Sequence, residues 1–324
     1  PWSGLVHVMS PKPKRKFKLR LKSKNKSYTL KDSGLYNLTT KKLLENRLEK
    51  SVSELRSLSD DSNYRVFFEE KPDGKKREIQ APTLGLDIVQ TRIASLLVRV
   101  STPDYLHSGV KKRSNITNAK VHVGDHPVLA MDIKNFYPSI SKKSVYHFFH
   151  NTMNASPDVA GVLANLCTYK GHIPTGSRLS MPLAFWANHT MFNELQSLCD
   201  SQRIAMSVYV DDLTFSGLSV NPLFKRNVER IVSDAGLTIH PTKSKLYKKG
   251  HPKLITGVII DGDTIKLRNK HHKAIYNLFN DMKVAESDEQ LAIIHEKLIG
   301  RLNAAGQIDS AFEIKARTLM AKIK

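Results

Sequence analysis

Two adjacent aspartates, Asp211 and Asp212, lie between two short runs of apolar and β-branched residues, 205–210 and 213–216. Runs of this composition are typical of β-strands, and the two residues between them leave room only for a tight turn. The turn would hold both carboxylates at the tip of a β-hairpin with apolar flanks. Because burial of adjacent negative charges is costly unless cations compensate, the fold must bring positive charge to this turn.

A third acid follows the same pattern. Asp132 ends the apolar run 128–132, which predicts a buried strand. If this strand neighbours the hairpin in one sheet, the three carboxylates converge. Carboxylate oxygens suit Mg²⁺, and two Mg²⁺ ions about 3.5–4 Å apart can activate a hydroxyl group and stabilise a leaving pyrophosphate. The pattern is therefore compatible with metal-assisted transfer of a nucleotidyl group.

A second Asp–Asp pair in the chain illustrates the alternative. Asp60 and Asp61 lie in a polar segment without apolar flanks, where such a pair is a solvated turn. An Asp–Asp pair alone is weak evidence for a metal site. On local pattern alone, both interpretations stay open for Asp211 and Asp212.

The charge of the chain indicates its partner. The 324 residues include 51 Lys and Arg against 30 Asp and Glu, a formal net charge of +21, which favours binding to a polyanion such as nucleic acid. Ten of the basic residues and no acidic residue lie in residues 1–31, and removing these ten from +21 leaves +11 on the rest. This segment is either a solvated tail or a phosphate-binding arm. Two further basic clusters are Lys111, Lys112 and Arg113, and Lys243, Lys245, Lys248, Lys249 and Lys253.

Composition excludes several classes of protein. Hydrophobic residues make up 40% of the chain, enough for a folded core. No run of about 18 apolar residues is present, so neither a membrane-spanning helix nor a signal peptide is predicted. Two cysteines, Cys167 and Cys199, cannot form a disulfide scaffold or a four-ligand zinc site. We expect two free thiols and a cytoplasmic location.

Hydrophobic periodicity predicts an α+β fold. Strands at 64–70 and 76–82 around a Pro-Asp-Gly turn predict a further hairpin, and Ser141 is expected to cap a helix that extends to residue 150. The other predicted helices are 35–60, 86–100, 156–169, 183–198, 222–235 and several from residue 271 onward. The other predicted strands are 237–239 and a hairpin of 254–260 with 263–267.

Several blocks of residues resemble the motifs of reverse transcriptases. Tyr209-Val-Asp-Asp212 resembles the Tyr-x-Asp-Asp motif of that family. The other matching blocks occur in the order that the family requires between about residues 64 and 260. They are Arg77-Glu-Ile-Gln-Ala-Pro82, Ala130-Met-Asp-Ile-Lys-Asn-Phe-Tyr-Pro-Ser-Ile140, Ile173-Pro-Thr-Gly-Ser177 and Gly236-Leu-Thr-Ile-His-Pro-Thr-Lys243.

Two blocks resemble the retron subfamily of bacterial reverse transcriptases. Asn118-Ala-Lys-Val-His122 fits the Asn-Ala-x-x-His signature, and Ile255-Thr-Gly257 stands where retrons carry Val-Thr-Gly. The short extent of chain after Leu267 is also expected of a retron enzyme rather than of a group II intron protein. The sequence departs from the common pattern at Thr175, where most reverse transcriptases have Gln, and at Arg178, where Pro is frequent.

The resemblance implies a metal-dependent active site. Asp132, Asp211 and Asp212 would be the catalytic acids: Asp132 and Asp211 would bind both metal ions, and Asp212 would support them. The Ile133 carbonyl would be a further metal ligand. Two Mg²⁺ ions are the expected cofactors, with Mn²⁺ as a substitute.

The resemblance also implies a site for deoxynucleoside triphosphates. Arg77 would clamp the triphosphate, and Tyr137 would pack under the sugar and exclude a 2′-hydroxyl. Lys243 would approach the pyrophosphate as a general acid or a source of positive charge. Thr175 and Gly176 would line the site. The alternatives are a surface Arg77, a core Tyr137 and a Lys243 that binds a nucleic-acid backbone.

A further set of residues is expected to contact RNA or DNA, as the basic clusters and the retron signature indicate. For Asn118 and His122 the alternative is local structure, with Asn118 as a helix cap and His122 as a hydrogen-bonded strand residue. The expected residues are Lys111, Lys112, Arg113, Asn118, His122, Lys245 and Lys248.

The resemblance implies the right-hand architecture of a polymerase. The expected domains are a basic N-terminal arm at 1–31, fingers with N-terminal helices at 32–126, a palm with fingers-like helices 151–170 at 127–250, and a palm–thumb hairpin with a helical thumb at 251–324.

The implied function is RNA-directed DNA synthesis in a retron, from a 2′-hydroxyl of the retron's own structured non-coding RNA, to give branched RNA–DNA in anti-phage defence. The implied partners are this RNA, its DNA product, deoxynucleoside triphosphates and a separate effector protein, with no membrane. The alternatives are a group II intron-like or other defence-associated reverse transcriptase, and an inactive RNA-binding scaffold of the same fold.

Overall fold

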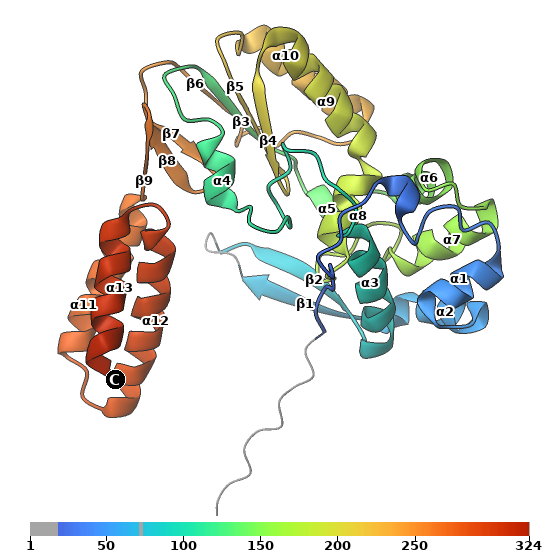
Figure 1. Ribbon diagram of the computed structural model, residues 1–324, viewed down its shortest axis with the longest axis horizontal. Coiled ribbons are helices and arrows are strands. Elements are labelled where there is room, and N and C mark those ends of the chain that lie inside the picture. The colour runs from blue at the N-terminus through green and yellow to red at the C-terminus, as the bar shows by residue number, and fades with distance from the viewer. Residues whose placement is uncertain (1–18, 71–73, 324) are drawn as a thin grey trace, which may run out of the picture.

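The computed structural model describes residues 19–70 and 74–323 of the chain. It combines helices with antiparallel sheets, which confirms the predicted α+β class. Figure 1 shows a sheet with helices behind it, a long β-hairpin beside a group of N-terminal helices, and a three-helix bundle at the other side. Most of the predicted basic arm and the Pro-Asp part of the predicted 71–75 turn lie outside the described residues.

The sheet that carries the predicted acids has four strands in the order β4-β5-β3-β6. The strands are β4 (Ala205–Tyr209), β5 (Asp212–Ser216), β3 (Val128–Asp132) and β6 (Lys245–Tyr247), and every neighbouring pair is antiparallel. The predicted hairpin and the predicted strand 128–132 are confirmed. The strand predicted at 237–239 is wrong, because this segment makes only a single bridge from Ile239 to Ile133.

Helices α8 (Ser180–Ala187), α9 (His189–Gln202) and α10 (Pro222–Asp234) pack in the main hydrophobic core with this sheet. Phe215 of β5 meets Phe224 of α10 edge to face at 5.4 Å between ring centroids. The single helix predicted at 183–198 is in fact two helices. They meet at Asn188, whose side-chain amide donates to the Ala184 carbonyl at 2.8 Å. Helix 222–235 is confirmed within one residue.

The other long hairpin consists of β1 (Tyr64–Glu70) and β2 (Lys76–Pro82), as predicted, and leads into α3 (Leu84–Leu97). The single helix predicted at 35–60 is wrong. The structure has α1 (Lys41–Leu48) and α2 (Val52–Leu58), because Glu49 adopts the left-handed conformation and Ser51 begins a new helix with a capping box to Glu54.

Shorter helices complete this part of the molecule. Ser141 caps α6 through its hydroxyl, as predicted, and a π-helical turn follows. The segment around the predicted RNA-binding residues 118 and 122 forms a helix that the sequence pattern did not predict. These elements are α4 (Asn115–Lys120), α5 (Phe136–Ser139), α6 (Lys142–His147), the turn Phe148–Thr152 and α7 (Pro157–Leu166).

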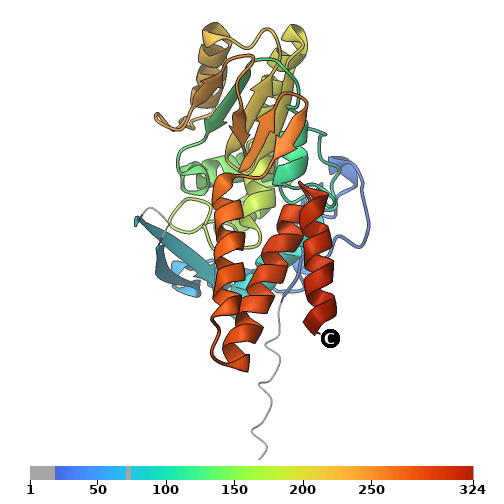
Figure 2. The ribbon, with the colours of Figure 1, turned by 90° about the vertical axis from the view of Figure 1, so that its left-hand side faces the viewer.

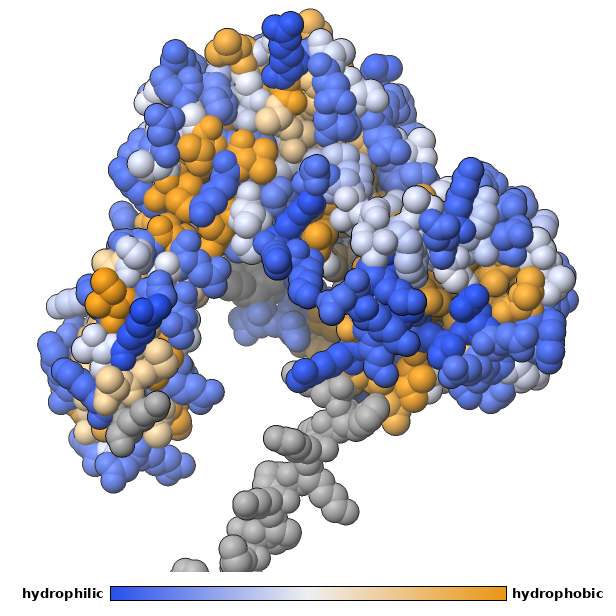
Figure 3. Space-filling model, viewed as in Figure 1, coloured by the Kyte–Doolittle hydropathy of each residue, from blue (hydrophilic) through white to orange (hydrophobic). Residues whose placement is uncertain are grey.

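The C-terminal part begins with a three-stranded antiparallel sheet of β7 (Lys253–Ile255), β8 (Val258–Asp261) and β9 (Thr264–Lys266). The strand predicted at 254–260 is broken because Thr256 and Gly257 both have positive φ, +42° and +86°. Three helices follow, as expected: α11 (Asn269–Lys283), α12 (Asp288–Gly306) and α13 (Ser310–Ile323). Figure 2 shows the bundle standing below the small sheet, and Figure 3 shows a hollow between the bundle and the rest of this face.

The described residues pack into separate hydrophobic cores, which show which parts of the chain fold together. One core takes residues from Leu35 to Leu237, and so joins the predicted fingers and palm. A small core beneath β7 and β8 includes Ile116 and Tyr247, and the helical bundle has a core of its own. The domain boundaries stay a prediction.

In the part of the chain that the structure describes, no helix has the length and apolar character needed to cross a bilayer. Cys167 and Cys199 are both free and buried.

His122 links two neighbouring strands of the four-stranded sheet, β4 and β5. Its two ring nitrogens lie 2.7 Å from the hydroxyl of Ser216 on β5 and 2.7 Å from that of Ser207 on β4. Burial lowers the pKa of His122 to about 3, with smaller effects of His126 and His107. The imidazole is therefore neutral in the folded protein and can hydrogen-bond both serines.

We predict that His122→Gln reduces the pH dependence of stability. The pKa of His122 in the unfolded chain is about 6.5, so below this pH the imidazole is protonated in the unfolded state and neutral in the folded state. His122 therefore lowers the free energy of unfolding by up to about 1.4 kcal/mol per pH unit as the pH falls. The Gln variant lacks this contribution. At pH 7 it is about 1–3 kcal/mol less stable, because buried hydroxyls lose a partner. Urea unfolding between pH 7 and about pH 5 measures both effects, and equal pH slopes would contradict the prediction.

Candidate active site

The strand register brings the three predicted acids together. Asp132, the last residue of β3, pairs directly with Asp212, the first residue of β5. Tyr209, the last residue of β4, also pairs with Asp212, so that only Val210 and Asp211 form the turn between β4 and β5. The predicted convergence of the three carboxylates is therefore confirmed by the sheet.

Main-chain hydrogen bonds hold this edge of the sheet in place. The Ile133 amide donates to the Asp211 carbonyl at 2.9 Å, and the His240 amide donates to the Asp132 carbonyl at 2.7 Å. The Lys134 amide donates to the Thr238 carbonyl at 2.8 Å. The turn with Asp211 and the segment 238–240 thus hold the end of β3 from two directions.

The acids lie close enough to perturb one another. Burial and repulsion by Asp211 and Asp132 together raise the pKa of Asp212 to about 7, against the opposing effect of Lys243. Burial and repulsion by Asp132 also raise the pKa of Asp211, against the opposing effects of Lys243 and Arg77. The nearby positive charge is therefore insufficient for three ionised carboxylates.

Lys243 is the cation in direct contact with the acids. Its Nζ lies 2.8 Å from Oδ2 of Asp132, and this hydrogen bond raises the pKa of Lys243. The Lys243 side chain is 56% exposed and that of Asp132 is 14% exposed, so the ammonium approaches from the solvent side.

The chemistry of the acids fits a hard divalent cation. Oxygen ligands with excess negative charge are what Mg²⁺ and Mn²⁺ prefer. Within residues 19–70 and 74–323, no three His, Cys, Asp or Glu side chains are already arranged around a metal position. The acids are instead arranged around an ion pair with Lys243, which makes a single contact to Asp132.

Arg77 and Tyr137 lie near the same acids. Burial, together with the charge of Asp211 and against that of Arg77, raises the pKa of Tyr137 to about 12, so the phenol is within electrostatic range of both residues. Phe136 is 5% exposed in the core, whereas Tyr137 is only half-buried. Of the two neighbouring aromatic residues, Phe136 is the core residue. The nucleotide-binding roles of Arg77 and Tyr137 stay predictions.

Thr175 and Gly176 hold the loop before α8 against β2. The Thr175 amide donates to Oε1 of Gln80 at 2.8 Å, and the Thr175 hydroxyl donates to the Glu78 carbonyl at 2.7 Å. A Cβ on Gly176 would lie 2.6 Å from the Gln80 carbonyl oxygen, so this contact requires glycine. Gln80, which the motif comparison did not single out as a site residue, therefore links the hairpin to the loop. Binding of a nucleotide by Thr175 and Gly176 stays a prediction.

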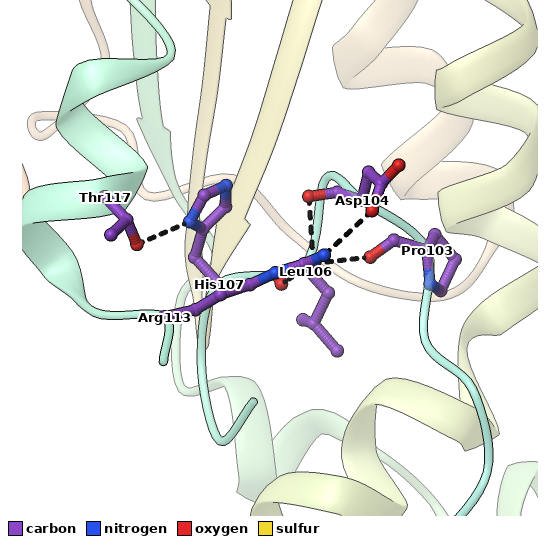
Figure 4. A network of polar contacts seen from close by, with 6 residues as sticks. All are labelled: Pro103, Asp104, Leu106, His107, Arg113 and Thr117. Carbon is purple, nitrogen blue, oxygen red and sulfur yellow. Dashed lines mark hydrogen bonds and ion pairs between the residues drawn. The ribbon is translucent and has the colours of Figure 1, made fainter. Parts of the chain in front are cut away.

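The structure corrects the predicted role of Arg113. Its guanidinium donates to the carbonyls of Pro103, Asp104 and Leu106 and forms an ion pair with Asp104 at 2.8 Å, as Figure 4 shows. These contacts occupy the donors that would bind a phosphate. Arg113 holds the loop 103–106 instead. Lys111 and Lys112 are exposed, and Lys111 contacts Asn25.

The two retron signature blocks contact each other rather than solvent. Asn118 and His122 are both 0% exposed, so direct contact of these side chains with RNA is wrong for this structure. Asn118 Nδ2 lies 3.5 Å from the Thr256 hydroxyl, and that hydroxyl donates to the Asn115 carbonyl at 2.8 Å. The signature residues therefore join α4 to the turn between β7 and β8.

The second basic cluster is divided by the fold. Lys245 and Lys248 are exposed, with Lys245 Nζ 4.5 Å from the ring centroid of Tyr247. Lys253 is 1% exposed and donates to the Gly124 carbonyl at 2.8 Å, so it does not belong to the surface cluster. The nucleic-acid contacts of Lys245 and Lys248 stay predictions.

Ser108 is a site residue that the sequence did not reveal. Val210 has φ +58°, a left-handed conformation that is strained for a β-branched residue. The Val210 amide donates to the Ser108 hydroxyl at 3.0 Å, and Ser108 is 6% exposed. Ser108 thus stabilises the strained turn that carries Asp211. A serine 102 positions away gives no local signal of this contact.

The antiparallel sheet with three converging acids, the hairpin β1–β2 and the helical bundle define an α+β protein of the right-hand polymerase class. No protein-family model matches the chain. Curated relatives do match. The Retron Se72 reverse transcriptase of Salmonella heidelberg (strain 579083-10) is 32% identical over 66% of this chain and 59% of the relative.

The Retron Ec86 and Ec48 reverse transcriptases of Escherichia coli are 25% and 24% identical over 85% and 84% of this chain, and over 86% and 72% of their own lengths. The chain is thus similar to retron reverse transcriptases over most of its length. It spans about three-fifths of the length of the Se72 relative. A solved structure of a foamy viral protease–reverse transcriptase with double-stranded DNA is 16% identical, with a TM-score of 0.47 over 81% of this chain and 39% of that chain.

We predict that Ser108→Ala disturbs the turn of Asp211. The variant should lose about 1–2 kcal/mol of unfolding free energy, and Mg²⁺ should raise its melting temperature less than that of the wild type, because the strained turn can relax. Val210→Gly in the same background should restore the Mg²⁺ effect, since glycine adopts positive φ without strain. Ser108→Thr keeps the hydroxyl and is the control. An unchanged Mg²⁺ effect in Ser108→Ala would contradict this role.

Proposed function

We propose that the chain is the RNA-directed DNA polymerase of a retron. It extends DNA from a 2′-hydroxyl of its own structured non-coding RNA and so forms branched RNA–DNA. The observation that carries the proposal is the register of β3, β4 and β5, which gathers Asp132, Asp211 and Asp212 at one edge of the sheet. The relatives named as retron reverse transcriptases support the same function.

Asp132 and Asp211 would hold Mg²⁺, with Mn²⁺ as a substitute, and the Ile133 carbonyl would be a further ligand. Two such ions would supply the charge that activates a hydroxyl nucleophile and stabilises the leaving pyrophosphate. Asp212 supports the arrangement from the β5 side of the pair with Asp132. The raised pKa values of Asp211 and Asp212 support this assignment, because bound cations would relieve the repulsion.

The other residues of the site would orient the nucleotide. Arg77 would contact the triphosphate of a deoxynucleoside triphosphate through its guanidinium. Tyr137, half-buried and close to Asp211, would pack under the sugar and exclude a 2′-hydroxyl. Lys243 contacts Asp132 at 2.8 Å and would turn to the pyrophosphate when metal ions take over the charge of the acids.

The wider role is part of the same proposal and is supported by the similarity to retron reverse transcriptases. The RNA serves as primer and template, its DNA product stays attached to it, and a separate effector protein acts with them in cytoplasmic anti-phage defence. The exposed Lys111, Lys112, Lys245 and Lys248 would contact the RNA or the DNA. A group II intron-like enzyme and an inactive scaffold are the competing functions, and neither has a structural observation in its favour.

We predict that Asp211→Asn abolishes DNA synthesis. Primer extension on an RNA template should need Mg²⁺ and should fall by at least about 100-fold, because the loss of one charge-stabilising group at a reacting centre costs that much. The variant should fold normally, because it removes one of three mutually repelling carboxylates.

Asp61→Asn is the matched control. It changes the second residue of the other Asp–Asp pair, and asparagine keeps an oxygen that can accept from the Lys170 amide, as Oδ1 of Asp61 does at 3.1 Å. This control should extend primers like the wild type. Equal DNA yields from wild type and Asp211→Asn would contradict the assignment of the acids, and a wild type that makes no DNA would support the scaffold.

A further inference from the structure

A surface lined mainly by basic residues lies apart from Asp132, Asp211 and Asp212. It lies between the N-terminal segment 19–24, the end of α1 and one side of α3. It forms a groove of about 730 Å³. None of Asp132, Asp211 and Asp212 lines this groove. Figures 1 and 3 show this N-terminal segment running along α3, with strongly hydrophilic side chains on this face.

The N-terminal wall of the groove is fixed by main-chain contacts. The Lys22 amide donates to the Ser95 hydroxyl at 3.0 Å, and Nε of Arg99 donates to the Lys22 carbonyl at 3.0 Å. The first contact joins the backbone of Lys22 to α3, and the second joins it to the segment just after α3. Successive side chains of residues 19–24 point to alternate sides: Leu19 and Leu21 are half-buried, whereas Arg20, Lys22 and Lys24 are exposed.

The charges that line the groove are nearly all positive. Glu49 is the one acidic lining residue among the described residues, and it forms an ion pair with Arg92 at 2.9 Å. Lys50 pairs with Glu54 outside the groove at 3.0 Å. Five lining cations have no ion pair within residues 19–70 and 74–323: Arg20, Lys22, Lys24, Arg47 and Arg99.

The other lining residues indicate how a ligand would be recognised. The floor is apolar, with Leu48, Val89 and Leu96, and no aromatic residue is among the described lining residues. A site without aromatic groups lacks the usual platforms on which bases stack, so its cations would recognise a nucleic acid mainly by its phosphates. Four of the five cations come from two separate segments. Arg20, Lys22 and Lys24 belong to the N-terminal segment 19–24, and Arg47 belongs to α1.

We propose that this groove binds the phosphate backbone of the structured RNA outside the polymerase site. The inference rests on the proposed function for the identity of the RNA, and on the groove itself for the binding of phosphates. A chain that must keep hold of one RNA while its template end moves through the active site needs such an anchor. The groove supplies it on the side of α3 where the N-terminal segment is docked.

The test is the binding of a synthetic RNA stem-loop with a single-stranded tail, measured by fluorescence anisotropy over a series of salt concentrations. The test variant combines Lys22→Gln, Lys24→Gln and Arg47→Gln, which leaves the main-chain contacts of Lys22 intact. Affinity should fall by about tenfold or more, and the slope of log K against log salt should become shallower by about 2, since each lost phosphate contact contributes about 0.7.

The matched control combines Lys225→Gln, Arg226→Gln and Arg230→Gln on α10, which removes the same charge from another face. It should keep the wild-type slope. A charge-preserving variant, Lys22→Arg with Lys24→Arg and Arg47→Lys, should keep the affinity and shows that the fold is intact. Equal losses of affinity and slope in the groove variant and the α10 variant would overturn the proposal, and so would normal RNA binding by the groove variant.

Failure of this inference can be told apart from failure of the proposed function. Primer extension by the wild type on a short RNA template tests the polymerase without the anisotropy assay. A wild type that extends primers while its groove variant binds the stem-loop normally would overturn the anchor alone. A wild type that makes no DNA while the groove variant loses RNA would overturn the polymerase alone.

Discussion

The repulsion among three carboxylates at one edge of the β-sheet is the constraint on which the site depends. Antiparallel pairing places Asp132 against Asp212, and the turn adds Asp211. The Lys243 ammonium contacts Asp132 at 2.8 Å, and the pKa values of Asp211 and Asp212 stay raised. Such a cluster weakens the fold unless cations arrive. The surrounding structure must therefore hold the edge firmly, as the hydrogen bonds of residues 133, 134 and 240 do. A stable protein accepts this cost where function needs it.

Sequence predicted the acids and their strands because alternation, tight turns and the motif order are local signals. It could not predict contacts between distant segments. Arg113 stands in a basic run that resembles a phosphate site, yet carbonyls from residues 103–106 surround its guanidinium. His122 fits a recognition motif, yet Ser207 and Ser216 enclose it. Helix breaks at Glu49 and Asn188 were missed because neither residue is a glycine or a proline. Ser108 gave no signal, since only the fold brings it to the turn at Val210.

The basic residues that give the chain its net charge of +21 therefore have several different roles. Some cations are structural: Arg113 fastens a loop, and Lys253 is buried against the Gly124 carbonyl. Lys243 forms an ion pair with Asp132 at the edge of the sheet. Five cations that form no ion pair within the described residues line the groove beside α3, over an apolar floor. In the proposed function, this division would separate the chemistry of the acids from the retention of RNA. It also explains why a run of basic residues in the sequence is a poor guide to the location of a nucleic acid.

The most direct test of the account is the nucleic acid that copurifies with the protein expressed together with its own RNA. The account predicts that wild-type protein carries RNA joined to single-stranded DNA of fixed length through a bond that debranching enzyme cleaves. It predicts that Asp211→Asn carries the same RNA without DNA. DNA of mixed lengths, or DNA not joined to RNA in this way, would contradict the retron function. The same branched product from Asp211→Asn would contradict the assignment of the acids.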